Sequence, residues 1–150
     1  MDVVILTSGP KNLWDTQYIY RYLGPYKVAS SCRNAGFTVQ IIDHVLFMSD
    51  EQIIKYLYKF VTPDTAVLAI SCTFMCKKLG AGSSSYRDVL DWPKNILLAV
   101  KMIKMLRPKI RIVLGGYNAN IVPGHGLVDA AILNYGEDIF TELVSHYIQN

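Results

Sequence analysis

Cysteine and histidine side chains are the candidate metal ligands of this chain. Cys72 and Cys76 have the first spacing of a CxxxCxxC iron–sulfur motif, but Leu79 stands at the third cysteine position. Zinc and iron–sulfur sites take three or four protein ligands. The three histidines are scattered, and none is paired with an obvious serine or cysteine and an aspartate at a strand end. The spacing therefore predicts no metal site made by the chain and no catalytic triad.

A second group of candidate residues is uncharged and consists mostly of hydroxyl, glycine and aromatic residues. Its members directly follow the apolar runs of the sequence. Hydroxyl groups can donate hydrogen bonds, and the pair Gly115-Gly116 lets a large flat ligand approach the backbone. A tight turn at the glycines, and hydroxyls that satisfy the last backbone groups of a strand, remain open alternatives. The residues of this group are Thr7, Ser8, Gly9, Ser71, Cys72, Thr73, Gly115, Gly116, Tyr117, Asn134, Tyr135 and Gly136.

Motifs that bind phosphate are missing beside these residues. The stretch from Ser8 to Asn12 does not match GxGxxG, and no GxxxxGK[ST] occurs. Ser71 stands where a phospho-acceptor receiver needs an aspartate. Thr7-Ser8-Gly9 is only weakly similar to the hydroxyl-rich first loop of a flavodoxin. The sequence thus argues against dinucleotide, P-loop and receiver functions.

Five apolar segments must position the group. Four are continuous runs, typical of strands covered on both faces of a parallel sheet, whereas the second alternates and suits a sheet edge. We expect a three-layer Rossmann-like, flavodoxin-like α/β fold with five parallel strands in the order 2-1-3-4-5. The carboxyl ends of strands one and three then form the ligand-binding edge. The segments are Val3–Leu6, Phe37–Ile41, Ala66–Ile70, Ile110–Leu114 and Ala130–Leu133.

Helices are expected after every strand, in strict alternation. Ser49 and Gln52 form a capping box, Pro93 suits a first helical turn, and Glu137 favours a helix N-terminus. An earlier helix ends near Gly36, which favours a left-handed cap. The stretch from Cys76 to Asp91 is a long loop, either a surface excursion or a lid over the carboxyl edge.

Composition bounds the remaining possibilities. The chain has 150 residues, which fits one domain, and its net charge of +3 is too small to predict nucleic-acid binding. Three cysteines, an odd number, favour reduced thiols in a cytoplasmic setting. No apolar run approaches the ~18 residues of a membrane span, and the N-terminus has no secretory signal pattern. We therefore expect neither nucleic acid nor a membrane as a partner.

Four stretches, in this order and spacing, give the chain a resemblance to a known family. Together they resemble the cobalamin-binding N-terminal domain of cobalamin-dependent radical S-adenosylmethionine enzymes, over nearly the whole chain. The stretches are Ala35–Asp43, Val67–Thr73, Ile112–Ala119 and Asp129–Glu137, with a Leu-Gly-Gly turn in the third and Gly-Glu at the end of the fourth.

The resemblance implies that the corrin ring lies at the carboxyl edge and the nucleotide tail enters the sheet cleft. By position, Ser71, Thr73, Gly115 and Gly116 would border the tail. The segment from Thr7 to Pro10 would lie under the ring, and the segment from Asn134 to Glu137 near the far end of the tail. Carried over in this way, Glu137 joins the candidate cofactor-binding residues.

Departures from the family pattern also have consequences. The DxHxxG motif, whose histidine ligates cobalt, should follow the first strand and is missing, while Asp43-His44 has the wrong place and spacing. Cobalamin would therefore bind without a histidine ligand. Asn118 stands where relatives often carry histidine. The radical barrel should follow the domain, so the chain is expected to act with a radical S-adenosylmethionine protein or domain elsewhere.

Three functional hypotheses follow from the sequence. The first is a cobalamin-binding module without a histidine ligand, which presents cobalt to a radical enzyme domain. The second is an interaction or scaffold domain that lost the cofactor and uses the loop from Lys77 to Arg87 to dock a partner. The third is a protein that binds another cofactor, such as a flavin, at the same edge.

Overall fold

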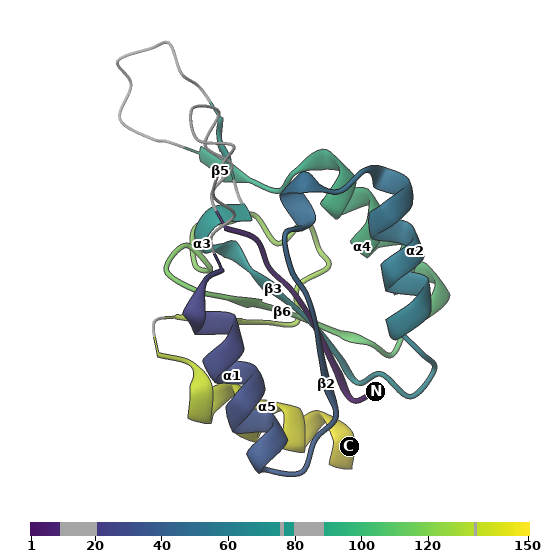
Figure 1. Ribbon diagram of the computed structural model, residues 1–150, viewed down its shortest axis with the longest axis vertical. Helices are drawn as coiled ribbons and strands as arrows, with labels where there is room; N and C mark the ends of the chain where they lie inside the picture. The colour runs from purple at the N-terminus through teal and green to yellow at the C-terminus, as the bar shows by residue number, and fades with distance from the viewer. Residues whose placement is uncertain (10–20, 76, 80–88, 134) are drawn as a thin grey trace.

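A computed structural model of the chain describes residues 1–9, 21–75, 77–79, 89–133 and 135–150 (Figure 1). Its elements are, in chain order, β1 Val3–Leu6, α1 Leu23–Asn34, β2 Val39–Ile42, a 3-10 helix Val45–Phe47, α2 Asp50–Phe60, β3 Val67–Ser71, α3 Cys72–Met75, β4 Lys77–Leu79, β5 Val89–Asp91, α4 Lys94–Leu106, β6 Arg111–Gly115, β7 Ala130–Ile132 and α5 Glu137–Gln149.

Five parallel strands form the central sheet in the order β2-β1-β3-β6-β7. This is the flavodoxin-like order 2-1-3-4-5, and it confirms the predicted fold class. Val3 of β1 pairs with Val39 of β2 on one side and with Val67 of β3 on the other. The strand order therefore reverses between β1 and β3, at the point where the sequence predicted it.

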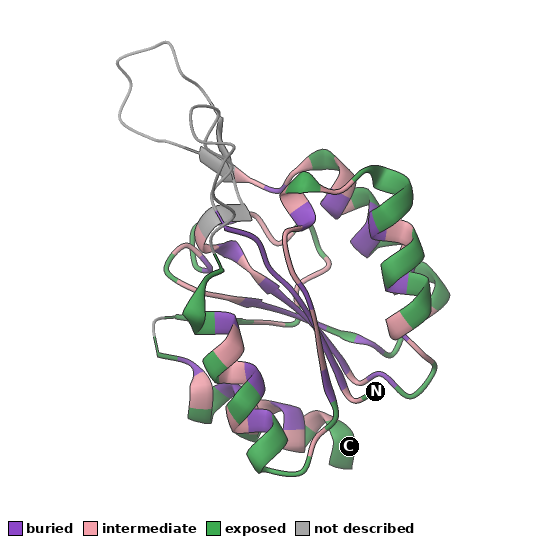
Figure 2. Cartoon of the chain, viewed as in Figure 1, coloured by how far each residue is buried: buried purple, intermediate pink, exposed green. Residues whose placement is uncertain are grey.

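Side chains alternate along the strands and fill two separate cores. Figure 2 shows the buried strands of the sheet between the two helix layers. Val4 and Leu6 face the layer formed by α2 and α4, whereas Val3 and Ile5 face the layer formed by α1 and α5. Figure 1 shows the two helix pairs on opposite sides of the sheet. The continuous apolar runs are thus explained by burial on both faces.

Most of the sequence signals that predicted helix ends agree with the structure. The Ser49 hydroxyl accepts a hydrogen bond from the Gln52 amide at 3.2 Å, and the Gln52 side chain accepts one from the Ser49 amide at 2.8 Å. The predicted capping box is therefore confirmed. Gly36 has φ +92° directly after the end of α1, as expected for a left-handed cap. Pro93 precedes α4 and is not in its first turn.

Two predictions about the connections are wrong. Residues 116–129, between β6 and β7, form turns and not the helix that strict alternation requires. Pro123, Gly124 and Gly126 break a helical pattern there. The stretch from Cys76 to Asp91 contains an antiparallel pair, β4 with β5, and β3 runs directly into α3. Residues 76 and 80–88 of the predicted loop lie outside the described residues.

Candidate functional site

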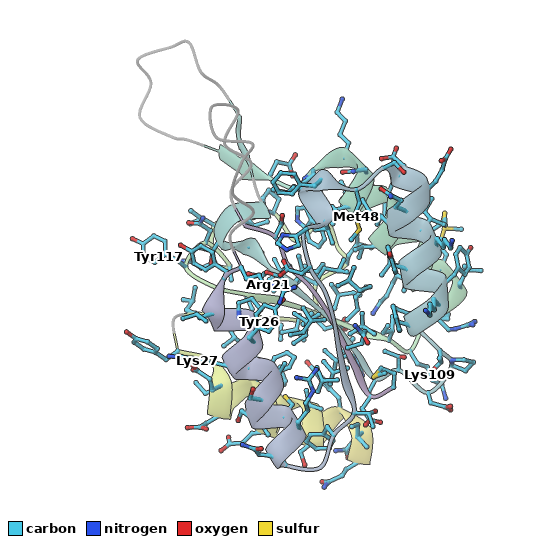
Figure 3. All side chains as sticks on the ribbon, in the orientation of Figure 1. Arg21, Tyr26, Lys27, Met48, Lys109 and Tyr117 are labelled. Carbon is cyan, nitrogen blue, oxygen red and sulfur yellow. The ribbon has the colours of Figure 1, made fainter. Side chains whose placement is uncertain are left out.

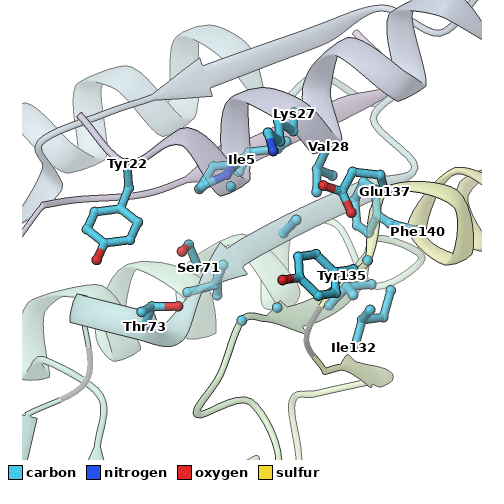
Figure 4. A pocket seen from close by; sticks show the side chains of 18 of the residues that line it. Ile5, Tyr22, Lys27, Val28, Ser71, Thr73, Ile132, Tyr135, Glu137 and Phe140 are labelled. Atoms are coloured by element: carbon cyan, nitrogen blue, oxygen red, sulfur yellow. The ribbon is translucent and has the colours of Figure 1, made fainter.

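A cavity of about 460 Å³ opens at the carboxyl end of the sheet, between the sheet and the first turns of α1 and α5 (Figure 4). Ligand pockets for small molecules have volumes of about 300–1,000 Å³. The cavity lies on the α1/α5 side of the reversal between β1 and β3. Its lining residues are Ile5, Tyr22, Leu23, Gly24, Pro25, Lys27, Val28, Ala69, Ile70, Ser71, Thr73, Val113, Gly115, Gly116, Tyr117, Ile132, Tyr135, Gly136, Glu137 and Phe140.

Candidate residues from three strand ends meet at this cavity. Those that line it are Ser71, Thr73, Gly115, Gly116, Tyr117, Tyr135, Gly136 and Glu137.

The other candidates lie elsewhere. Thr7, Ser8 and Gly9 are buried at the end of β1, outside the set that lines the cavity. Cys72 is fully buried in the core under α2 and α4, on the opposite face of the sheet. Asn134 lies outside the described residues.

Gly115 and Gly116 have different roles in the wall. A Cβ atom added to Gly115 would meet no atom within 4 Å, because this position faces the open cavity on the same side of β6 as Val113. Gly116 has φ +106°, and a Cβ atom there would clash with Oγ1 of Thr73. Gly115 therefore leaves space for a ligand, whereas Gly116 is required by the backbone and by its contact with Thr73.

Thr73 belongs to a corner that joins α3 to the segment after β6. The Asn118 side chain donates a hydrogen bond to the Thr73 carbonyl at 3.3 Å, and the Gly116 amide donates to the Ile132 carbonyl at 3.2 Å. These bonds tie the ends of β3, β6 and β7 together at the cavity. Asn118, which stands where relatives of the resembled family often carry histidine, therefore has a structural partner here.

Aromatic and apolar side chains surround the mouth. Tyr117 is 77% exposed and Tyr135 is 89% exposed, and Tyr22 and Leu23 are exposed on the α1 side. Figure 4 shows Tyr22 and Tyr135 on two sides of the opening, with Ser71 and Thr73 between them. Exposed aromatic rings beside a cavity favour a flat ligand, since they offer faces on which it can stack.

Charge is sparse in this lining. Lys27 of α1 and Glu137 of α5 are its two charged residues, and no ion pair joins them in the described part of the chain. Val28, Ile132 and Phe140 make the inner wall apolar. The cavity therefore suits a ligand with a large uncharged body, with polar groups at the mouth.

The ends of β1 and β2 form a separate polar corner. The Tyr26 hydroxyl donates to Oδ2 of Asp43 at 2.6 Å; burial and this hydrogen bond raise the pKa of the Tyr26 phenol. His44 has φ 60°, and its Nε2 lies 3.6 Å from Oδ2 of Asp43. Oγ1 of Thr7 is buried and has no hydrogen-bond partner among the described residues. Asp43 and His44 do not line the cavity.

The first turn of α1 is the part of the site that the sequence reasoning missed. Leu23, Gly24 and Pro25 line the cavity together with Lys27 and Val28. The sequence pattern placed only the end of this helix, near Gly36, so its N-terminal turn had no assigned role. The pair Gly24-Pro25 was the available signal, because proline favours the first turn of a helix.

No protein-family model matches the chain, and no curated protein matches it. Within the described ranges, no group of three or more histidine, cysteine, aspartate or glutamate residues could hold a metal ion. None of the described helices is both long and apolar enough to cross a membrane. The fold and the cavity define the class, a flavodoxin-like α/β domain with a ligand-sized cavity at the carboxyl ends of β3, β6 and β7.

Proposed function

We propose that the chain is a cobalamin-binding module that holds the cofactor without a histidine ligand. The cavity between α1 and α5 carries this proposal, because it lies at the carboxyl edge and has a wall without a side chain at Gly115. The sequence resemblance supports the same cofactor. The alternative functions are a scaffold domain without a cofactor and a flavin-binding protein.

The residues fit a part of the cofactor rather than all of it. A cavity of about 460 Å³ accepts a drug-sized group, and its inner wall is apolar, as a planar base requires. The nucleotide tail would lie against Gly115, Ser71 and Thr73. The larger corrin ring would lie outside, over the mouth beside Tyr117 and Tyr135. When bound, cobalamin supplies cobalt chemistry, and the chain itself orients the cofactor and shields its tail from water.

The partner in this proposal is a radical S-adenosylmethionine catalytic domain or protein. The described cavity contains no paired nucleophile and base, so a reaction needs groups from another polypeptide region. The exposed mouth leaves one side of a bound ring accessible to such a partner.

Titration of the purified protein with hydroxocobalamin, followed by visible absorbance, tests the proposal. We expect saturable binding that Gly115→Leu weakens about tenfold or more, because the added side chain occupies the cavity. Ala131→Leu is the matched control, since it adds a leucine at an exposed position of β7. Thermal unfolding of both unliganded variants shows whether each is folded.

The outcomes separate the alternatives. Absence of saturable corrin binding by the wild-type protein would overturn the proposal, and saturable binding of flavin mononucleotide in its place would favour the flavin alternative. Equal affinities of wild-type and folded Gly115→Leu protein would show that the cavity is not the site. Binding of neither cofactor would favour the scaffold function.

A further inference from the structure

The outer surface of α4 combines positive charge with protruding apolar side chains. Exposed residues at helical spacing form a stripe along the helix; we call it the α4 stripe, and it consists of Lys94, Leu98, Lys101 and Met105. Leu98 is 63% exposed and Met105 is 81% exposed. Because the opposite side of α4 is packed on the sheet through Ile96, Val100 and other residues, the stripe is available to a partner.

All charged residues of α4 and of the segment that follows it, up to Val128, are basic. No aspartate or glutamate occurs from residue 92 to residue 128, while Lys109 adds an exposed cation beyond the end of α4 (Figure 3). Lys94, Lys101 and Lys109 have no ion pair with a described acidic residue, in contrast to Lys104, which contacts Asp129 at 3.0 Å. Within the described residues, the cations of the stripe therefore have no acidic partner.

The neighbouring helix extends this surface. Figure 1 shows α2 beside α4 in the same layer. The exposed residues of α2 include Lys55, Lys59, Tyr56 and Tyr58, together with Asp50 and Glu51 in its first turn. Tyrosine is enriched at the interface between lipid and water, because its ring is apolar and its hydroxyl is polar.

In the opposite layer α5 is acidic, whereas α1 carries Lys27 and Arg33. Helix α5 carries Glu137, Asp138 and Glu142 and no lysine or arginine. The positive surface is therefore that of α4, and it gives the protein a preferred side next to an anionic surface.

We propose that the α4 stripe binds the surface of an anionic lipid bilayer. Lysines next to an anionic surface are each attracted to it, and Leu98 and Met105 can enter the headgroup region between them. The convex stripe and its alternation of cations with apolar groups favour a deformable surface over an acidic protein segment. A lipid surface as partner departs from the sequence expectation of no membrane partner. That expectation rested on the lack of a membrane-spanning run, whereas this attachment needs only surface contact.

This orientation leaves the cavity on the side of the sheet away from the lipid. The cavity is lined from α1 and α5, whereas the α4 stripe lies in the other layer. Lipid binding and ligand binding are therefore independent, and each can be measured without the other.

Flotation with two kinds of vesicles tests the lipid proposal. One kind contains phosphatidylcholine alone, and the other contains equal parts of phosphatidylcholine and phosphatidylglycerol. We expect the protein to float only with the anionic vesicles, and binding to weaken at high salt. The double variant Lys94→Glu/Lys101→Glu should lower the partition coefficient about 25-fold or more, since each lysine near such a surface contributes about a factor of five.

A charge-matched control distinguishes a local surface from net charge. Arg21→Glu with Arg33→Glu changes the net charge equally on the α1 side, and we expect anionic vesicles to bind this variant nearly as well as the wild type. The double variant Leu98→Ser/Met105→Ser should weaken vesicle binding and leave its salt dependence unchanged, because the substitutions remove apolar side chains and no charge. Circular dichroism of each variant verifies the fold.

Three results would overturn the proposal. The first is a wild-type protein that does not float with anionic vesicles at low salt. The second is equal loss of binding in the two charge-reversed variants. The third is absence of vesicle binding together with salt-sensitive binding of polyglutamate. If Lys94→Glu/Lys101→Glu removed the polyglutamate binding, an acidic protein partner would be favoured.

Discussion

Asp129 joins three elements, so its removal should lower the stability of the whole domain. Its Oδ2 accepts hydrogen bonds from the Ile112 amide at 2.8 Å and from Nζ of Lys104 at 3.0 Å. Its Oδ1 accepts one from Nη1 of Arg111 at 3.0 Å. The carboxylate thereby links the start of β7 to β6 and to α4.

The magnitude of the loss in Asp129→Ala follows from these contacts. The Ile112 residue is fully buried, so its amide would lose its partner out of reach of water, at a cost of about 1–3 kcal/mol. Lys104 is mostly covered, whereas half of the Arg111 side chain is exposed, so each ion pair contributes about 0–1 kcal/mol. We expect the free energy of unfolding to fall by about 2–4 kcal/mol.

Asp129→Asn separates the charge from the hydrogen bond. An amide oxygen can still accept from the Ile112 amide, so the expected loss at neutral pH is about 1 kcal/mol. Although burial alone raises the pKa of the Asp129 carboxyl, hydrogen bonds from Ile112, Lys104 and Arg111 hold it below its usual value. The carboxylate therefore stabilises the fold above the unfolded-state pKa of about 3.9, and this contribution disappears as the pH falls through the folded-state pKa.

Urea denaturation of the wild type and both variants, at pH 7 and again below pH 4, measures these quantities. The difference between wild type and Asp129→Asn should shrink at the lower pH. A loss below about 0.5 kcal/mol in Asp129→Ala is ordinary for a surface substitution. Such a result would refute the argument that Asp129 stabilises the domain by linking β6, β7 and α4. A difference between wild type and Asp129→Asn that is unchanged at low pH would refute the charge argument.

Two further predictions concern local features of the fold, a glycine with positive φ and a helix cap. Gly116→Ala should lower the free energy of unfolding by about 2 kcal/mol or more in urea denaturation, because of its positive φ and the clash with Thr73, whereas Gly115→Ala should change it by less than about 1 kcal/mol. Similar losses in the two variants would contradict this. Ser49→Ala should cost about 1 kcal/mol through loss of the cap on α2, and a thermal midpoint equal to that of the wild type would show that the cap contributes nothing.

The sheet was predictable because its signals are local. Val3–Leu6 is apolar at every position, which requires cover on both faces, and the alternating second strand belongs at an edge. The antiparallel pair β4 and β5 was missed, because each strand has three residues and their pairing depends on contacts distant in the sequence. The turns of residues 116–129 were also missed. Their conformation depends on the packing of Ala119 and Val122 in the core, and such tertiary contacts are not visible in a local sequence pattern.

The site was predictable only at the level of strand ends. Topology brings Ser71 and Gly115 to one edge, where they pair in register. The alternation of side chains also places Ser71 on the same face as Ala69, toward the cavity, and Cys72 on the same face as Ile70. The sequence pattern could therefore have separated Ser71 from Cys72. The α1 contribution could not be found in this way, since the position of a helix over a sheet is set by packing.

The unequal filling of the two faces has a consequence for the stability of the empty protein. Among the described residues, twenty buried residues form the core under α2 and α4, but eleven form the core under α1 and α5. Small residues such as Ala69 and Gly115 leave the second side short of van der Waals contacts. A molecule that occupied the cavity would complete this interior, so resistance to unfolding would rise with its concentration. Under the proposed function, the second core of this domain is completed by its ligand.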